Sequence, residues 1–134
     1  MKGMILVVED NPTNMKLMVQ ALGVDGYTVL TSENGDGLVE QVAAQPVDLV
    51  LMDIQLTNRS GVDLLRDLRA DPRTAGVPVL AVTAFADPEA TSDFHEAGFD
   101  QVVTKPISVR HLLKVVASYC RGGAALAPSQ LPQI

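Results

Sequence analysis

The sequence is poor in cysteine, in aromatic side chains and in positive charge. A single cysteine, Cys120, excludes an internal disulfide and is typical of a cytosolic protein. Aromatic residues make up 4% of the chain and Trp is absent, so aliphatic side chains must fill the core of a chain that is 47% hydrophobic. The formal net charge of -6 argues against direct nucleic-acid binding, which requires a basic surface.

Long hydrophobic runs are also missing. No stretch reaches the roughly 18–20 apolar residues of a membrane-spanning helix. Met1-Lys2-Gly3 leads into a strand-like run without a signal-peptide cleavage pattern, so a cytoplasmic protein without membrane contact is expected. Glycine-rich phosphate loops are absent, and nothing indicates nucleotide binding. A length of 134 residues predicts one domain, expected over residues 1–121, with a flexible tail over residues 122–134.

The chain alternates between short apolar runs and amphipathic stretches. The apolar runs predict five strands, at residues 4–8, 27–31, 49–53, 77–83 and 101–104. Apolar residues at helical spacing predict five helices, which begin near Pro12, Gly37, Val62, Asp87 and Val109. Gly122-Gly123 is expected to end the last of them. This alternation predicts an α/β, doubly wound parallel sheet of the flavodoxin-like kind, with strand order 2-1-3-4-5.

Polar side chains stand at the carboxyl ends of four predicted strands. Glu9-Asp10 follows the first strand and Asp53 ends the third. In the order 2-1-3-4-5 these two strands are neighbours, so their three carboxylates would meet in one cleft. Thr83 ends the fourth strand and Lys105 follows the fifth, which places both on the same rim.

This set of side chains suits phosphoryl chemistry. Three carboxylates in a small cleft repel one another, and oxygen ligands alone favour Mg²⁺ or Mn²⁺ as the cation that relieves the repulsion. A carboxylate beside such an ion can attack phosphorus and form an aspartyl-phosphate. The Thr83 hydroxyl and the Lys105 ammonium can bind the remaining phosphoryl oxygens. Each feature alone is commonplace, and their conjunction predicts a phosphoryl-acceptor site.

The sequence resembles the receiver domains of two-component response regulators over about residues 4–121. The resemblance rests on four stretches: Val7-Val8-Glu9-Asp10-Asn11, Leu51-Met52-Asp53-Ile54, Val82-Thr83-Ala84 and Thr104-Lys105-Pro106. Within the family the chain is most similar to stand-alone receivers of the DivK type.

The resemblance implies a signalling module that catalyses its own phosphorylation and dephosphorylation. Asp53 would accept a phosphoryl group from a histidine kinase or a histidine phosphotransfer protein. Thr83 would be the switch hydroxyl and Lys105 the phosphoryl-binding lysine. Mg²⁺ would bind three carboxylates and one backbone carbonyl, those of Glu9, Asp10, Asp53 and Gln55. The output would be a changed contact with a downstream protein target.

Two details of the fifth strand bear on the switch. Many family members carry an aromatic residue three positions before the lysine, where this chain has Val102, so the usual rotation of that aromatic is not expected here. Lys105 must also turn back into the cleft directly from the strand. A cis Lys105–Pro106 bond would permit so tight a turn.

Two other function classes share parts of this pattern. A Mg²⁺-dependent phosphotransferase or phosphatase of the haloacid-dehalogenase kind also has an Asp nucleophile. Such enzymes usually place a second Asp two residues later, where this chain has Gln55. A flavodoxin-like binding module would share the fold, but the acidic cleft would repel a flavin phosphate. Repeated turnover of a small phosphodonor would favour the enzyme, and one stable adduct would favour the receiver.

Overall fold

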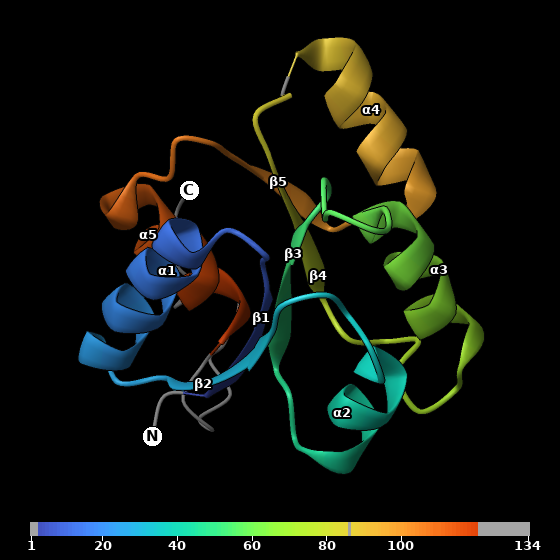
Figure 1. The fold of residues 1–134 in the computed structure, drawn as a ribbon, viewed down its shortest axis with the longest axis horizontal. Helices are drawn as coiled ribbons and strands as arrows, with labels where there is room; N and C mark the ends of the chain where they lie inside the picture. Colours follow the sequence, from blue (N-terminus) through green and yellow to red (C-terminus); the bar gives the residue numbers. More distant parts are fainter. Residues whose placement is uncertain (1–2, 86, 121–134) are drawn as a thin grey trace, which may run out of the picture.

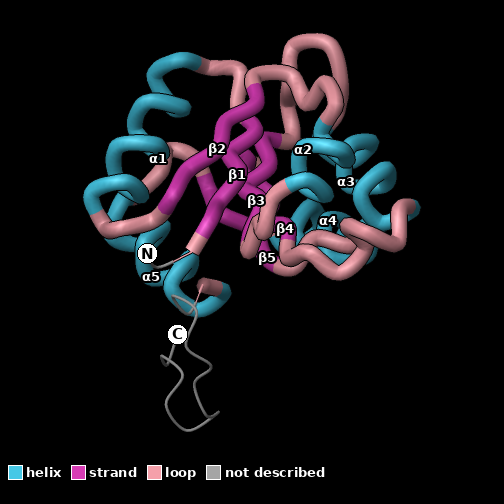
Figure 2. Tube along the Cα trace, turned by 90° about the horizontal axis from the view of Figure 1, so that it is seen from below, coloured by secondary structure: helices cyan, strands magenta, loops and turns pink. Residues whose placement is uncertain are grey.

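One parallel sheet forms the centre of the molecule (Figures 1 and 2). The computed structural model of the chain describes residues 3–85 and 87–120. The strands lie in the order β2-β1-β3-β4-β5. Their bounds are β1 (Met4–Val8), β2 (Thr28–Ser32), β3 (Leu49–Asp53), β4 (Val79–Thr83) and β5 (Gln101–Thr104). The predicted topology is confirmed.

In the part of the chain that the structure describes, five helices cover the two faces of the sheet. Their bounds are α1 (Pro12–Val24), α2 (Leu38–Ala44), α3 (Gly61–Ala70), α4 (Pro88–Ala97) and α5 (Val109–Tyr119). Helices α1 and α5 lie on one face, and α2, α3 and α4 on the other (Figure 1). Because side chains alternate along a strand, Ile5 and Val7 pack toward α1 and α5, while Leu6 and Val8 pack toward α2 and α3. The sheet therefore has a separate aliphatic core on each face.

The strands buried on both faces are β3 and β4, in which every residue is buried. The edge strands β2 and β5 carry mostly half-buried residues. Such burial explains why β3 reads as a continuous apolar run, and why the carboxylate at its end, Asp53, must lie at the mouth of the sheet.

Side chains cap the starts of α1 and α5. Asn11 Oδ1 accepts hydrogen bonds from the backbone N–H groups of Thr13 and Asn14, at 2.9 and 3.1 Å. Ser108 Oγ accepts from the backbone N–H of His111 at 3.3 Å. These bonds satisfy amides that have no partner within the first turn of a helix.

Several predicted boundaries are wrong, and the second strand runs over Thr28–Ser32 instead of residues 27–31. The fourth strand begins at Val79 instead of Val77, and α3 begins at Gly61 instead of Val62 because Ser60 caps it. Helix α5 ends at Tyr119, before the glycine pair, because Cys120 is buried and adopts an extended backbone with φ -114 and ψ 119. The glycine pair and the predicted tail lie outside the described residues.

Helix α4 is weakly attached and has no buried residue. Near its C-terminal end, Phe94 packs edge-to-face on Phe99 with ring centroids 5.9 Å apart. The Arg69 guanidinium of α3 donates to the carbonyl of Gly98, directly after α4, at 3.1 Å. Helix α4 is thus held at its C-terminal end. Nearer its N-terminal end Ala90 and Thr91 are only half-buried, so little burial opposes movement there.

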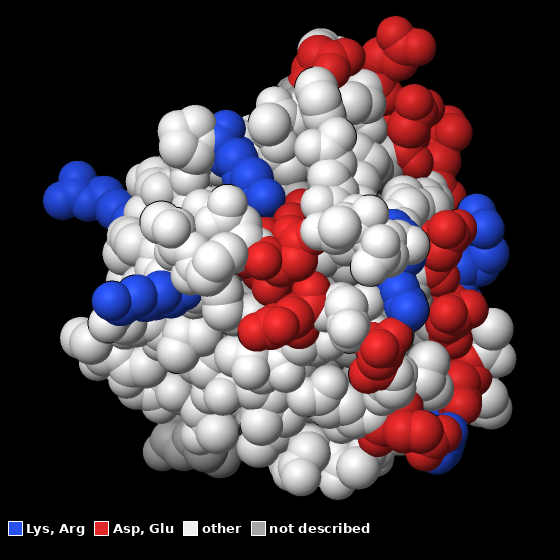
Figure 3. All heavy atoms as spheres, viewed as in Figure 1, with Lys and Arg blue, Asp and Glu red and all other residues white. Residues whose placement is uncertain are grey.

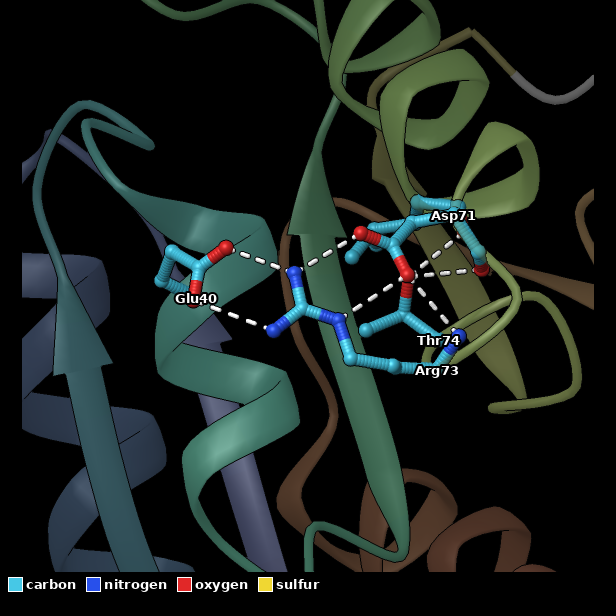
Figure 4. A network of polar contacts seen from close by, with 5 residues as sticks. Glu40, Asp71, Arg73 and Thr74 are labelled. Carbon is cyan, nitrogen blue, oxygen red and sulfur yellow. Dashed lines mark hydrogen bonds and ion pairs between the residues drawn. The ribbon is translucent and has the colours of Figure 1, made fainter.

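A polar network links α2 to the loop after α3 (Figure 4). Arg73 Nη2 lies 2.6 Å from Glu40 Oε1 and 2.8 Å from Asp71 Oδ2. The hydrogen bonds from Arg73 lower the pKa of both carboxyls, and the two carboxylates raise the pKa of Arg73. These side chains are largely solvent-screened, so we expect the network to orient the loop more than to stabilise the fold.

Within the described residues, no helix combines the length and the apolar character that a bilayer crossing requires.

Candidate functional site

Three carboxylates meet at the carboxyl ends of β1 and β3. Val8 pairs with Met52, so the residues that follow them reach the same edge of the sheet. One ligand oxygen each from Glu9, Asp10 and Asp53 lies within 4.8 Å of the other two. Glu9 and Asp53 are buried, and Asp10 is half-buried. Acidic side chains gather near the middle of this face of the molecule, as Figure 3 shows.

Lys105 points into this cluster, as predicted. Its Nζ lies 3.2 Å from Glu9 Oε1 and 3.3 Å from Asp53 Oδ2. The Lys105–Pro106 bond is cis, which confirms that prediction. Burial would lower the pKa of Lys105, but the charges of Glu9 and Asp53 outweigh burial and raise that pKa. The ammonium is therefore a permanent positive charge between two carboxylates.

Glu9 is the most perturbed acid of the cluster. Burial, and secondly the adjoining Asp53 carboxyl, raise the pKa of Glu9 from 4.5 to about 7. Its Oε2 accepts a hydrogen bond from the backbone N–H of Asn11 at 3.2 Å. Its Oε1 accepts no hydrogen bond from the described residues and lies 3.2 Å from the Lys105 ammonium. A buried carboxyl oxygen without a donor is rare and calls for an explanation.

The raised pKa of Glu9 predicts a pH-dependent stability in the absence of divalent cations. The folded protein keeps a proton on Glu9 that the unfolded chain releases above its ordinary pKa of 4.5. The resulting stabilisation is complete below that value and is lost as pH rises through about 7. We expect the free energy of unfolding of the wild type, measured with denaturant in chelator, to fall from pH 5.5 to 7.5. The Glu9→Gln variant should lack that fall, and an equal fall in both proteins would contradict the assignment.

Thr83 and Gln55 lie beside the cluster. The buried Thr83 hydroxyl accepts a hydrogen bond from the backbone N–H of Phe85 at 3.0 Å, so its own hydrogen is left to donate elsewhere. The carbonyl of Thr83 accepts from the backbone N–H of Lys105 at 2.8 Å, which joins the ends of β4 and β5. The backbone N–H of Gln55 donates to Asp53 Oδ1 at 3.1 Å, and the exposed Gln55 side chain is no substitute for a second acid.

One residue of the site was missed at the sequence level. Thr57 lies in the loop between β3 and α3, where its backbone N–H donates to Asp10 Oδ2 at 2.7 Å and its hydroxyl donates to the same oxygen. The hydroxyl bond is the main cause that lowers the pKa of Asp10. No sequence pattern signals this contact, because an isolated threonine in a loop is unremarkable and lies 47 positions from Asp10.

The cluster suits a hard divalent cation. The group offers one carboxylate oxygen from each of three residues, and oxygen ligands are those that Mg²⁺ prefers. The buried Glu9 oxygen without a hydrogen-bond donor has the character of a metal ligand. The residues present therefore fit a magnesium ion.

Sequence comparisons identify relatives over most of the chain. The sequence profile described as "Response regulator receiver domain" matches residues 5–117. The polar-differentiation response regulator DivK of Brucella anthropi is 35% identical over 115 residues, which are 86% of this chain and 94% of that protein.

Solved structures show the same fold. The receiver domain of a sensor histidine kinase from Pseudomonas aeruginosa, with a magnesium ion coordinated in its active site cleft, has a TM-score of 0.79 and 29% identity. The alignment covers 89% of this chain and 98% of that one. The chemotaxis protein CheY4 of Vibrio cholerae has a TM-score of 0.82 over 89% of this chain and 99% of its own, at 20% identity. With its acidic cluster at the ends of β1 and β3, this chain belongs to the receiver domains of response regulators, the signalling family of two-component systems.

Proposed function

We propose that this protein is a single-domain response regulator whose phosphoacceptor is Asp53. A histidine kinase or a histidine phosphotransfer protein would supply the phosphoryl group, and the phosphorylated form would change its contacts with a downstream protein target. The observation that carries the proposal is the Lys105 ammonium, 3.2 Å from Glu9 and 3.3 Å from Asp53. A fixed cation between a candidate nucleophile and a second acid suits the binding of a phosphoryl group.

In this proposal, a carboxylate oxygen of Asp53 attacks phosphorus, and the bond from phosphorus to the donor nitrogen breaks. The donor imidazole keeps the bonding electron pair, and Asp53 becomes an acyl phosphate. Lys105 stabilises the negative charge of the phosphoryl oxygens from one side. Before the transfer, the Lys105 ammonium also forms an ion pair with the Asp53 carboxylate, at 3.3 Å.

Magnesium completes the proposed site. Glu9, Asp10, Asp53 and the backbone carbonyl of Gln55 would hold the ion, which supplies positive charge to carboxylate and phosphoryl oxygens. The related receiver from Pseudomonas aeruginosa supports this assignment, since it binds magnesium in its active site cleft. We also take residues 1–121 as the folded unit, which the family match over residues 5–117 supports.

Phosphorylation by a small donor tests the proposal. The wild-type protein is mixed with acetyl phosphate and Mg²⁺, and intact-protein mass spectrometry and released phosphate are followed together. We expect one added phosphoryl group per chain, and no adduct in excess chelator. Release of many equivalents of phosphate without a stable adduct would instead favour the Mg²⁺-dependent phosphatase or phosphotransferase, against which the glutamine at position 55 already argues.

We expect the switch to act through α4 and not through β5. To donate to a phosphoryl oxygen, the Thr83 hydroxyl must turn inward, which breaks its 3.0 Å bond from the Phe85 N–H. That bond holds the segment that leads to α4, the helix without buried residues. Val102 is small and has a restricted side-chain torsion, so β5 has no large side chain there to rearrange.

Amide hydrogen exchange with and without beryllofluoride, a phosphoryl mimic, tests the division of movement. We expect changed exchange at residues 84 and 85 and in α4, with little change in β5. A change confined to β5 would show that the signal follows another route.

A further inference from the structure

We propose that Thr57 is a positioning residue of the metal site, which holds one oxygen of Asp10 so that the other faces the ion. The inference rests on the proposed binding of Mg²⁺ and assigns a role to a residue outside the carboxylate cluster.

The contact has two donors and one acceptor. The backbone N–H of Thr57 lies 2.7 Å from Asp10 Oδ2, and the Thr57 hydroxyl donates to the same atom. Both donors therefore occupy Oδ2, and we take Oδ1 as the oxygen that Asp10 offers to an ion. Because two bonds to one atom fix the rotation of the carboxylate, Asp10 has less freedom to lose when an ion binds.

The loop that carries Thr57 is itself held in place. Its neighbour Leu56 is buried, with 8% of its surface exposed. Gln55 and Ser60 form an isolated antiparallel bridge across the loop, and the backbone N–H of Gly61 donates to the carbonyl of Ile54 at 2.9 Å. The two donors of Thr57 thus come from a constrained segment, which lets them orient Asp10 before an ion arrives.

Two opposite effects on metal affinity are conceivable from such donors. They withdraw electron density from Asp10, which weakens it as a ligand, and they keep it ionised and oriented, which strengthens the site. Hydrogen-bond partners of metal ligands generally have the second effect, and their removal typically costs 10–100-fold in affinity.

Magnesium titration by isothermal calorimetry tests the role of the hydroxyl. Thr57→Val removes the hydroxyl but keeps the backbone N–H and the shape, and Thr57→Ser keeps both donors. Thr31→Val makes the same change at an exposed threonine of β2 and is the matched control. We expect the dissociation constant for Mg²⁺ to rise about tenfold in Thr57→Val. It should stay at the wild-type value in Thr57→Ser and Thr31→Val.

Stability without metal separates positioning from folding. Thr57 is exposed, so Thr57→Val should unfold in chelator at a denaturant concentration close to that of the wild type. Equal or tighter Mg²⁺ binding by Thr57→Val, or weak binding by Thr57→Ser, would overturn the inference while the proposed phosphoacceptor still stands. If the wild type itself bound no Mg²⁺, the proposed metal site and this inference would fail together.

Discussion

Replacing Asp53 with asparagine should abolish the phosphoryl adduct and leave the fold intact. Asparagine keeps the shape of the side chain and the Oδ1 acceptor that receives the Gln55 N–H at 3.1 Å. Its neutral amide is no longer a nucleophile toward phosphorus. The change also removes one negative charge beside Glu9, whose pKa is raised to about 7 by burial and by the Asp53 carboxyl. We therefore expect no loss of stability. Intact-protein mass spectrometry with acetyl phosphate and Mg²⁺ is the measurement.

The matched control is Asp63→Asn, because that carboxylate lies on α3 with 65% of its side chain exposed. It should form the adduct as fully as the wild type. A normal adduct on Asp53→Asn would mean that another side chain accepts the phosphoryl group, and peptide mapping of the adduct would then identify it.

Gly61→Ala should destabilise the protein by about 1–3 kcal/mol, the usual cost of overpacking a tight site. A Cβ at this position would lie 2.5 Å from the carbonyl oxygen of Asp53 and 3.0 Å from the Cα of Ile54. Both atoms belong to the backbone and cannot rotate away. Relief requires a shift of the end of β3, so phosphorylation of Asp53 should slow as well. The free energy of unfolding is measured by chemical denaturation.

Gly23→Ala provides the opposite case within the same protein. Gly23 lies in α1, and a Cβ there would meet no heavy atom within 4 Å. The alanine should be neutral or stabilise the protein by up to about 1 kcal/mol, the difference in helix propensity. Equal stabilities for the two variants would show that the close approach of α3 to β3 relaxes at no cost.

The sequence predicted the sheet and the carboxylate cluster because one physical rule determines both. Strands buried on two faces must be apolar along their length, so a carboxylate that interrupts such a run marks its end. Glu9 and Asp53 both mark ends in this way, and the strand order then places them together. Lys105 followed from the same reasoning applied to β5.

Contacts between loops could not be predicted in this way. The bonds from Thr57 to Asp10 depend on the path of a loop, which no hydrophobic periodicity encodes. The end of α5 was misplaced for a related reason. The glycine pair is a strong local stop signal, but burial of Cys120 in an extended conformation ends the helix sooner, and tertiary packing overrides the local preference.

The contacts at one end of α4 determine how this helix can tilt. Arg69 and the contact between Phe94 and Phe99 hold its C-terminal end, so we expect the helix to pivot about that end. The ten residues of α4 span about 15 Å, so any tilt produces its largest displacement at Pro88, on the side that leads back to Thr83. A partner bound to the first turn of α4 would therefore experience a large displacement when the helix tilts by a small angle. A partner bound to the last turn would experience a smaller displacement.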